Sequence, residues 1–323
     1  MNHPFPMRAV LLAGALLAST CSLAQPYPYK PIRIVVPFAA GGAVDTVARV
    51  VGQKVAEQVG QVVVVENKPG GHANIGADYV AKSAPDGYTV LLGANGLATN
   101  MTLHKDIPFD TLRDFAPVAG VGYAPLVLAV PASFPAKSLR EFLAQAQAKP
   151  GSFNYGTAGG GTSGHLASEL FKLTAKFDAL HVPYKGGAPA LTDLIGERLS
   201  FMLINPIEAA PHVKAGKLRA LAVSSGRRLA MLPEVPTFAE AGVPGFEASV
   251  WWGFVAPAKT PKEALARLSA EVLKALQDAT VREKLAALGA VVEPQDAEGF
   301  GRFLKSEIDK WARVIQAAKI TAE

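Results

Sequence analysis

The stretch IRIVVPFAAGGAVDTVAR at residues 32–49 decides the fold, and the stretch FNYGTAGGGTSGHLASELF at residues 153–171 repeats its pattern. In each, an apolar strand runs through glycines into a helix. The N–H groups in the first turn of a helix lack partners within the helix, and the helix dipole adds about half a positive charge there. Each stretch therefore predicts a binding site for an anion. Gly42 and Gly161 are expected to tolerate no side chain, because a Cβ would block the backbone angle or the approach of a ligand.

The two halves of the chain continue alike after the glycine turns. Each has a second strand that ends in Pro and Gly-Gly, then a short helix, then a third strand. These segments are VVVVENKPGG (62–71), the helix 74–84 and the strand 88–96 in the first half, and DALHVPYKGG (178–187), the helix 190–198 and the strand 199–207 in the second. Ligands of parallel α/β sheets bind beyond the carboxyl ends of the strands. We therefore predict an α/β fold of two lobes, each built on a parallel sheet, with a cleft for a small acid between them.

Two segments are predicted to cross between the lobes. The strand at 124–131 leads out of the first lobe, and the strand at 249–257 returns to it. The amphipathic helices that follow should pack on the first lobe, because their apolar faces have no predicted partner in the second. Lobe 1 is thus expected at residues 25–125 and 256–323, and lobe 2 at residues 126–255. Two crossing segments make a hinge about which a cleft can close.

The N-terminus has the pattern of a cleavable export signal. Arg8 precedes an apolar run at residues 9–18, and Ser22 and Ala24 are small residues at the positions that a signal peptidase reads. We predict cleavage after Ala24 and a periplasmic mature protein. Because Cys21 leaves with this segment, the mature chain has no cysteine for a disulfide, a thiol nucleophile or a thiolate metal site.

Charge and the remaining motifs argue against several classes of function. The formal net charge is +5, but Lys and Arg are scattered without interleaved aromatic residues, so no nucleic-acid partner is expected. The histidines of the mature chain lack metal-ligand spacing. Gly159, Gly161 and Gly164 match the dinucleotide motif GxGxxG, yet the acidic residue that should end the next strand is missing. Ser163 lacks the GxSxG context of a nucleophile. We predict no cofactor, no metal and no enzymatic activity.

Together these residues resemble a known family, the Bug or TctC receptors, which are the extracytoplasmic solute-binding subunits of tripartite tricarboxylate transporters. The resemblance covers nearly the whole chain from Pro31 onward. Blocks that carry it include VPFAAGGAVDTVAR (36–49), NIGADYVAKSAPDGYT (74–89), YGTAGGGTSGHL (155–166), HVPYKGGAPALTDLIGERL (181–199) and WWGFVAPAKTP (251–261). It implies a periplasmic binding protein of the Venus-flytrap type that delivers a small carboxylate (an organic acid, an amino acid or an aromatic acid) to a membrane permease. A sensory subunit that presents its solute to a signalling protein is the alternative on the same fold. We expect a monomer.

The resemblance also implies where the ligand binds. Contacts are expected at 38–42 and at 157–162 with His165, and a rim at 93–96 and 183–187. With neighbouring residues at the strand ends, the candidate ligand-binding residues are Phe38, Ala39, Ala40, Gly41, Gly42, Asp45, Gly93, Ala94, Asn95, Thr157, Ala158, Gly159, Gly161, Thr162, His165, Lys185, Ile204, Asn205 and Glu208.

Some of these residues have a second interpretation. The carboxylate of Asp45 would either bond N–H groups of its own turn or contact the ligand. Lys185 would either bind the anion or stay in solvent. Trp251 and Trp252 point to opposite faces of one strand, so one is expected in the core and the other on the cleft wall or the surface.

The chain departs from the usual family pattern at two places. After ENKPG the family usually has Ala and two Gly, where this chain has Gly-His-Ala at 71–73. Where the family tends to read FMFDNLPSALPH, this chain reads FMLINPIEAAPH (201–212), so that Ile204 replaces an acid and Glu208 a small polar residue. If Glu208 faces the cleft, its charge would favour a monocarboxylate with a donor group. Otherwise Glu208 caps the following helix and faces water.

Overall fold

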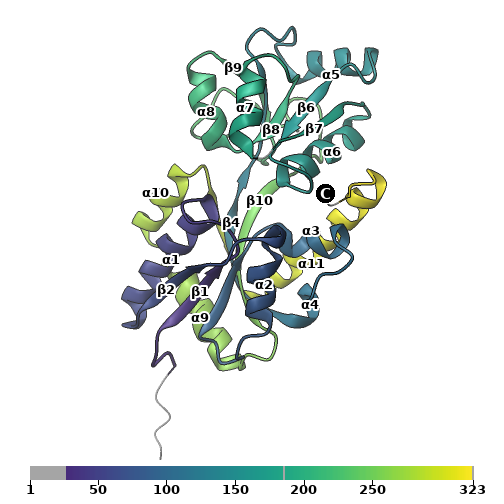
Figure 1. Cartoon of the computed structure of the whole chain (residues 1–323). Coiled ribbons are helices and arrows are strands. Elements are labelled where there is room, and N and C mark those ends of the chain that lie inside the picture. The colour runs from purple at the N-terminus through teal and green to yellow at the C-terminus, as the bar shows by residue number, and fades with distance from the viewer. Residues whose placement is uncertain (1–26, 185, 322–323) are drawn as a thin grey trace, which may run out of the picture.

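The computed structural model describes residues 27–184 and 186–321 of the 323-residue chain. The predicted export signal and Lys185 therefore lie outside the described residues. Figure 1 shows two lobes joined by long strands, with helices flanking the strands in both. The C-terminal helix α11 (Ala297–Ala317) lies along the first lobe and reaches toward the second.

Both glycine stretches fold as strand, turn and helix, as predicted. β1 (Ile32–Val36) runs into α1 (Ala43–Val59), and β6 (Asn154–Thr157) runs into α6 (Ser163–Ala175). Apart from the exposed Arg33, β1 consists of buried Ile and Val, as is typical of strands covered on both faces. It pairs in parallel with β2 (Val63–Asn67) and β3 (Thr89–Gly93), and β6 pairs in parallel with β7 (Leu180–Pro183). The rest of the two halves consists of α2 (Asn74–Ala81), α7 (Gly187–Ile195) and β8 (Met202–Ile204).

The crossing segments are antiparallel strands, which corrects the prediction of purely parallel sheets. β10 (Ser249–Pro257) pairs antiparallel with β3 and with β4 (Phe115–Pro125), and β4 pairs antiparallel with β11 (Val291–Gln295). The first-lobe sheet has the order β11-β4-β10-β3-β1-β2. A strand that returns from the other lobe enters the sheet from the opposite end, which fixes its direction. β10 pairs with β4 along its whole length, so it is part of the first-lobe sheet. The lobe boundaries at residues 125 and 255 stay predictions.

β4 is an element that the sequence did not predict. The pattern predicts one strand at 124–131, whereas the structure has β4 and then β5 (Val127–Pro131), separated by Leu126. Glycines and prolines interrupt the apolar pattern of β4, and such residues weaken a strand prediction. At Gly122 a Cβ would stand 2.2 Å from the carbonyl oxygen of Val291 in β11, so glycine is required for this close approach. Two short helices, α3 (Gly96–Leu103) and α4 (Thr111–Asp114), connect β3 to β4.

The second-lobe sheet also mixes strand directions. β5 pairs antiparallel with β8 and with β9 (Leu218–Val223), and a parallel bridge from Tyr155 to Phe201 joins β6 to the segment before β8. α5 (Leu139–Ala148) begins at the predicted cap, where the Ser138 hydroxyl accepts the Glu141 N–H at 3.2 Å. α8 (Pro206–Lys214) follows β8 and completes the helices of this lobe.

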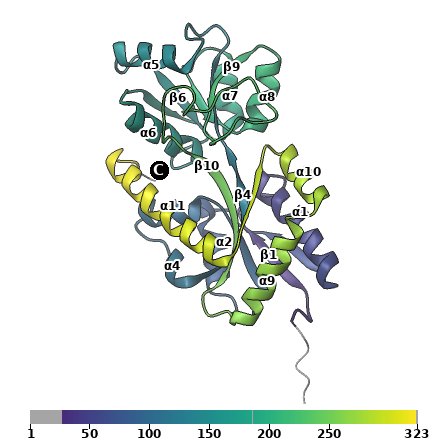
Figure 2. The same ribbon diagram turned by 180° about the vertical axis from the view of Figure 1, so that it is seen from behind.

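The C-terminal helices pack on the first lobe, as predicted. Leu268 and Val272 of α9 (Lys262–Ala275) are buried in one core with residues of α1, and α11 buries Phe300 and Trp311 in another. α10 (Ala279–Ala287) lies between them in the chain. Figure 2 shows α9 and α11 crossing the sheet from behind. α11 also contacts α6 of the second lobe, a partner that the sequence did not predict.

The tandem tryptophans of β10 are both buried. Trp251 is 1% exposed and Trp252 is 2% exposed. Trp251 packs against Phe300 and Phe303 of α11, and Trp252 belongs to the separate core that includes α1 and α9. The expectation that one of them lies on the cleft wall or the surface is wrong, because helices cover both faces of this sheet.

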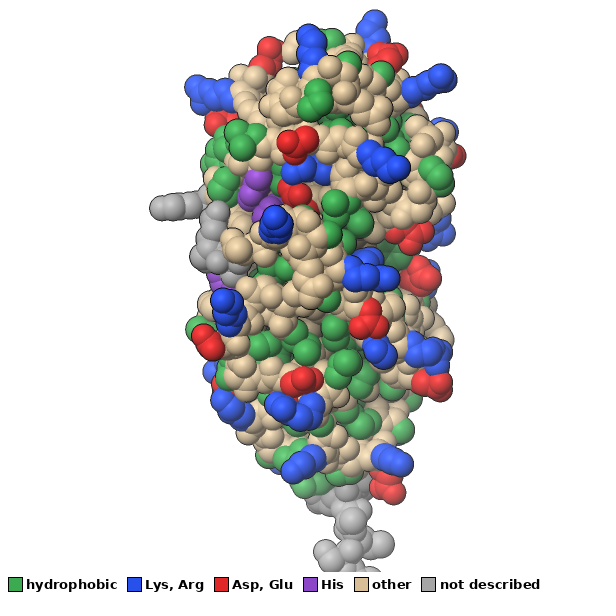
Figure 3. Space-filling model, turned by 90° about the vertical axis from the view of Figure 1, so that its right-hand side faces the viewer, with side chains coloured by type: hydrophobic (Ala, Val, Ile, Leu, Met, Phe, Trp, Pro, Cys, Tyr) green, Lys and Arg blue, Asp and Glu red, His purple; other side chains and the backbone are tan. Residues whose placement is uncertain are grey.

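The surface carries charges of both signs. On the face shown in Figure 3, Lys and Arg side chains are interspersed with Asp and Glu side chains. That face offers no extended basic stripe of the kind that binds nucleic acid. Within the described ranges, no helix combines the length and the apolar character needed to cross a membrane.

Candidate functional site

A cavity of about 260 Å³, which we call the cleft, opens between the lobes, and its lining includes Phe38 and Val44 on either side of the first glycine turn and residues 160–162 of the second. Its first-lobe wall comes from the ends of β1 and β3, from the short helix η1 (Gly71–Ala73) and from α3, and residues 160–163 before and at the start of α6 form the opposite wall. Val250 of β10 lies at the hinge. The cleft is lined by Phe38, Val44, His72, Ala73, Ala94, Asn95, Gly96, Thr99, Asn100, Leu103, His104, Gly160, Gly161, Thr162, Ser163 and Val250.

The first glycine turn is held by the side chain of Asp45. Its Oδ2 accepts the Gly41 N–H at 2.9 Å, and its Oδ1 accepts an N–H of the Asn67 amide at 2.9 Å. The same amide donates to the carbonyl oxygen of Phe38 at 3.0 Å, which ties the end of β1 to the turn. A hydrogen bond from Arg49 lowers the pKa of Asp45 to about 2. Asp45 is only 3% exposed, so its geometry matches the interpretation in which the carboxylate bonds its own turn.

The second glycine turn repeats this arrangement with a histidine in place of the aspartate. The Gly161 N–H donates to Nδ1 of His165 at 3.0 Å, the same spacing of four residues as between Gly41 and Asp45. Gly41 and Gly161 have left-handed φ angles of 85° and 70°. The φ of Gly42 is −78°, which any residue can adopt. The backbone angle therefore demands glycine at Gly41 and not at Gly42, which corrects that part of the expectation.

Neither helix that follows a glycine turn is capped by a side chain. Gly42 and Thr162 are the N-caps of α1 and α6, and no side chain among the described residues caps the helix N–H groups there. Side-chain oxygens of Ser138, Asp278 and Asp296 do cap α5, α10 and α11. The first turns of α1 and α6 can therefore offer their N–H groups to an anion, whose charge the helix dipole favours.

Burial keeps His165 neutral behind the second turn. Its ring stacks on that of His181 with the centroids 3.8 Å apart. Burial, together with the neighbouring charges of His181 and Lys172, lowers the pKa of His165 to about 4. Because Nδ1 accepts the Gly161 N–H, the proton of the neutral ring is on Nε2. Thr157 is buried as well, with its hydroxyl oxygen 2.7 Å from Nε2 of His181.

The predicted site residues divide into three groups. Those that line the cleft are Phe38, Ala94, Asn95, Gly161 and Thr162. Those that form or support the two turns and the adjoining strand ends are Ala39, Ala40, Gly41, Gly42, Asp45, Gly93, Thr157, Ala158, Gly159 and His165. Ile204, Asn205 and Glu208 do not line the cleft.

Ile204 and Glu208 have structural surroundings that explain their absence from the cleft. Ile204 is 5% exposed and lies in a second-lobe core with Val127 and Leu199, which corrects the prediction that it faces the ligand. The carboxylate of Glu208 lies beside the start of α7, 3.6 Å from the position of a Cβ on Gly187. Although the residue as a whole is exposed, burial of the carboxyl group raises its pKa. Asn205 is the N-cap residue of α8.

The sequence did not predict the part of the cleft wall formed by η1 and by α3 beyond Gly96. His72 and His104 lie there with their ring centroids 4.9 Å apart, and the Asn100 amide donates to the carbonyl oxygen of His72 at 2.7 Å. The departure from the family pattern at 71–73 draws attention to His72, but no local sequence pattern predicts its contact with His104. In the part of the chain that the structure describes, no group of three or more His, Cys, Asp or Glu side chains is placed to hold a metal ion.

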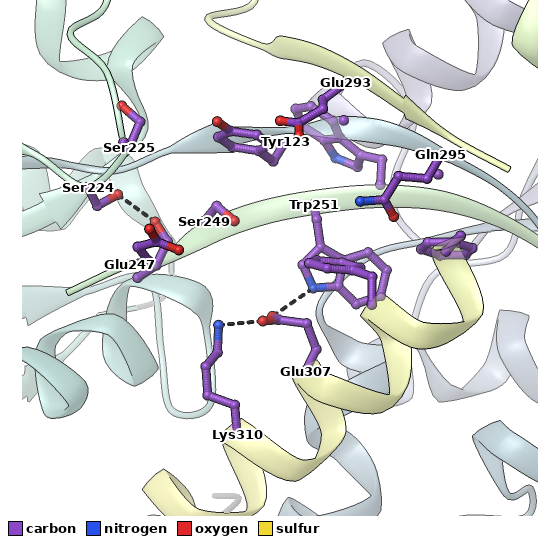
Figure 4. A pocket seen from close by; sticks show the side chains of 17 residues that line it. Tyr123, Ser224, Ser225, Glu247, Ser249, Trp251, Glu293, Gln295, Glu307 and Lys310 are labelled. Carbon is purple, nitrogen blue, oxygen red and sulfur yellow. Dashed lines mark hydrogen bonds and ion pairs between the residues drawn. The ribbon is translucent and has the colours of Figure 1, made fainter. Parts of the chain in front are cut away.

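A second cavity of about 380 Å³, which we call the hinge cavity, lies on the other flank of the crossing strands (Figure 4). It is bounded by β4, β10, β11, α11 and the end of β9, whereas the cleft lies on the β3 side of β10. Glu247, Glu293 and Glu307 line it together with Lys310. The Trp251 indole N–H donates to Glu307 at 3.1 Å, and Lys310 forms an ion pair with the same carboxylate. The hinge cavity is therefore rich in carboxylates.

Comparison with known proteins gives consistent matches. A family model described as the tripartite tricarboxylate transporter family receptor matches residues 47–320. A solved structure described as "R. palustris Rpa4515 with adipate" is 36% identical, with a TM-score of 0.79, and covers 91% of this chain and 99% of its own.

Two further solved structures share this fold. The periplasmic binding protein BugD is 32% identical, with a TM-score of 0.76, over 92% of this chain and 100% of its own. MatC from Rhodopseudomonas palustris with bound malate is 33% identical, with a TM-score of 0.75, over 90% of this chain and 100% of its own. The predicted two-lobed α/β fold is thus the fold of a solved periplasmic binding protein.

Proposed function

Because this chain belongs to the tripartite tricarboxylate transporter family of receptors, we propose that it captures a small carboxylate in the cleft and delivers it to the membrane subunits of such a transporter. It is a solute-binding receptor of the periplasmic binding protein fold and not an enzyme. The export signal with cleavage after Ala24 would place the mature chain in the periplasm. We propose that it acts there as a monomer.

The observation that carries this proposal is the pair of uncapped helix starts. Gly42 and Thr162 leave the first-turn N–H groups of α1 and α6 without a side-chain partner among the described residues. These groups belong to different lobes, so one bound carboxylate would attract both. None of the described residues that line the cleft is Asp or Glu, so no carboxylate among them repels an anion.

The size of the cleft limits the size of the ligand that it can hold. Its volume of about 260 Å³ is below the 300–1,000 Å³ typical of pockets for drug-sized molecules. Two of the related structures hold adipate or malate, which are small dicarboxylates. We propose an organic acid of about this size as the solute.

Thermal unfolding of the protein without its export signal tests this function. Ligand at 100 times its Kd should stabilise the fold by about 2.7 kcal/mol and raise the melting temperature. The panel should contain C4 to C6 carboxylates and, as matched controls, the uncharged diamides of the same chain length. Stabilisation by an acid and not by its diamide supports the proposal. No stabilisation by any acid at millimolar concentration would contradict it.

A second experiment tests the delivery step. Pull-down from membranes with the liganded protein should recover transporter subunits. Recovery of a signalling protein in their place would favour the sensory role.

A further inference from the structure

His72 and His104 form a pair on the first-lobe wall of the cleft. His72 comes from η1 and His104 follows the last residue of α3, and both line the cavity. Their rings are 4.9 Å apart between centroids and tilted by 46°. His72 is exposed to the solvent of the cleft and His104 is half-buried. Two imidazoles from separate elements are thus brought together at the surface that a ligand would touch.

The backbone that carries His72 is strained. His72 and Ala73 have φ angles of 55° and 74°, in the left-handed region that side chains with a Cβ rarely adopt. The Asn100 amide holds this segment by donating to the carbonyl oxygen of His72 and to the Asn74 side chain, both at 2.7 Å. Strain of this kind persists only where surrounding structure determines it, and it concentrates at functional sites. The strained segment thus presents the His72 side chain to the cleft.

The surroundings of the pair favour an anionic partner. Across the cleft stand residues 160–163, which carry no charge, and behind them His165, which stays neutral. Lys105 and Asp106 follow His104 in the chain and are exposed. Burial and the nearby His72 lower the pKa of His104, so this ring is largely neutral at pH 7. A neutral imidazole has one N–H to donate and a protonated one has two.

We infer that His72 and His104 bind the second carboxylate of a dicarboxylate whose first carboxylate sits at the two glycine turns. This rests on the proposed carboxylate function and assigns two residues that select among carboxylates. An anion within about 4–6 Å of an imidazole favours its protonated form. Binding of the dicarboxylate should therefore take up a proton, and affinity should rise as the pH falls from 8 to 6.

The test is isothermal titration of a dicarboxylate and of the monocarboxylate of equal chain length. We compare the wild type with His72→Gly, His104→Gln and the double variant. Glycine fits the left-handed φ at position 72, so the first variant should fold at least as well as the wild type. Each single variant should weaken dicarboxylate binding about tenfold or more and change monocarboxylate binding less than about threefold, since each removes one charge-assisted bond.

The pH dependence separates binding from a structural role. The wild type should bind the dicarboxylate more tightly at pH 6 than at pH 8, with proton uptake measured in two buffers of different ionisation heat. The double variant should lose both effects.

Equal dicarboxylate affinity and an equal pH profile in the wild type and the double variant would overturn the assignment and leave the proposed function standing. Failure of the wild type to bind any carboxylate would contradict both the histidine assignment and the proposed function. His72→Asn, which tolerates the left-handed angle, repeats the test if His72→Gly alters the melting temperature.

Discussion

The cleft and the hinge cavity lie on opposite flanks of the same pair of strands, yet they have opposite chemistry. Among the described residues, no Asp or Glu lines the cleft, and two uncapped helix starts face it. The hinge cavity is lined by Glu247, Glu293 and Glu307, with Lys310 as the counter-ion of Glu307. The hinge cavity is also the larger of the two, at about 380 Å³ against about 260 Å³.

This difference shows that volume alone does not locate the site of an anion. A carboxylate in the hinge cavity would be repelled by several carboxylates in a partly enclosed space, where Coulomb repulsion is stronger than in water. In the cleft the same ligand meets N–H donors and positive helix ends. The hinge cavity has a structural explanation instead, because Glu307 accepts the indole N–H groups of both Trp251 and Trp311 and so anchors α11 to the hinge.

The largest expected effect comes from closing the cleft at Gly161. Gly161→Val should abolish detectable carboxylate binding, because the φ of 70° is strained for valine and its Cβ would stand 3.0 Å from a Leu103 methyl group of the other lobe. Gly42→Ala is the matched control. Its φ is ordinary and its Cβ would make only a 3.7 Å contact, so affinity should change little. Titration calorimetry measures both. Normal binding by Gly161→Val would show that the cleft is not the site.

The next largest effect tests whether the different charges of the two cavities decide where the anion binds. Ser163→Glu places a carboxylate at the first position of α6, where the helix dipole favours it, so the fold should keep its stability. Repulsion over about 6 Å at an effective dielectric constant of 20 is about 3 kcal/mol, so affinity for the acid should fall about 100-fold.

Two controls isolate that charge. Ser163→Gln has the same size without the charge and should bind within about tenfold of the wild type. Glu247→Gln removes a charge from the hinge cavity and should change affinity less than about threefold. A larger effect at Glu247 than at Ser163 would reverse the assignment of the two cavities.

The glycine turns were predictable because their signal is local. A strand, glycines and a helix within 19 residues predict the turn and the helix start that follows it, and the structure has both. The C-terminal helices were predictable from the periodicity of residues such as Leu268 and Trp311. The general two-lobed fold followed from the same repeated pattern.

The features that could not be predicted from the sequence depend on contacts between segments that lie far apart in the chain. β4 is a strand because β10 and β11 supply its partners, although Gly120 and Gly122 weaken its own preference. His72 meets His104 only because η1 packs beside α3. Glu208 could not be assigned from sequence, because the same spacing permits a carboxylate in the cleft or beside α7.

The smallest expected effect is on the pH dependence of stability, and it concerns His165 and Asp45, the two side chains that bond the glycine turns. The pKa of His165 is about 4 in the fold, against an ordinary value of 6.5, so between these values the unfolded chain binds more protons and stability falls as the pH falls. The loss should be about 2 kcal/mol between pH 8 and pH 5. The pKa of Asp45 is lowered to about 2, so the stability that this carboxylate contributes is lost only as the pH falls below its ordinary value of 3.8.

Chemical denaturation across this pH range measures that loss. His165→Gln keeps an acceptor for the Gly161 N–H but does not titrate, so its stability should fall less with acid. Identical pH profiles for the variant and the wild type would mean that His165 is not the titrating group.

The most direct test of the central claim is a crystal structure of the protein saturated with the dicarboxylate that stabilises it most. The account predicts a carboxylate in the cleft, within hydrogen-bonding distance of N–H groups of α1 and α6 at the two glycine turns. A carboxylate bound in the hinge cavity, with the cleft free of ligand, would contradict it.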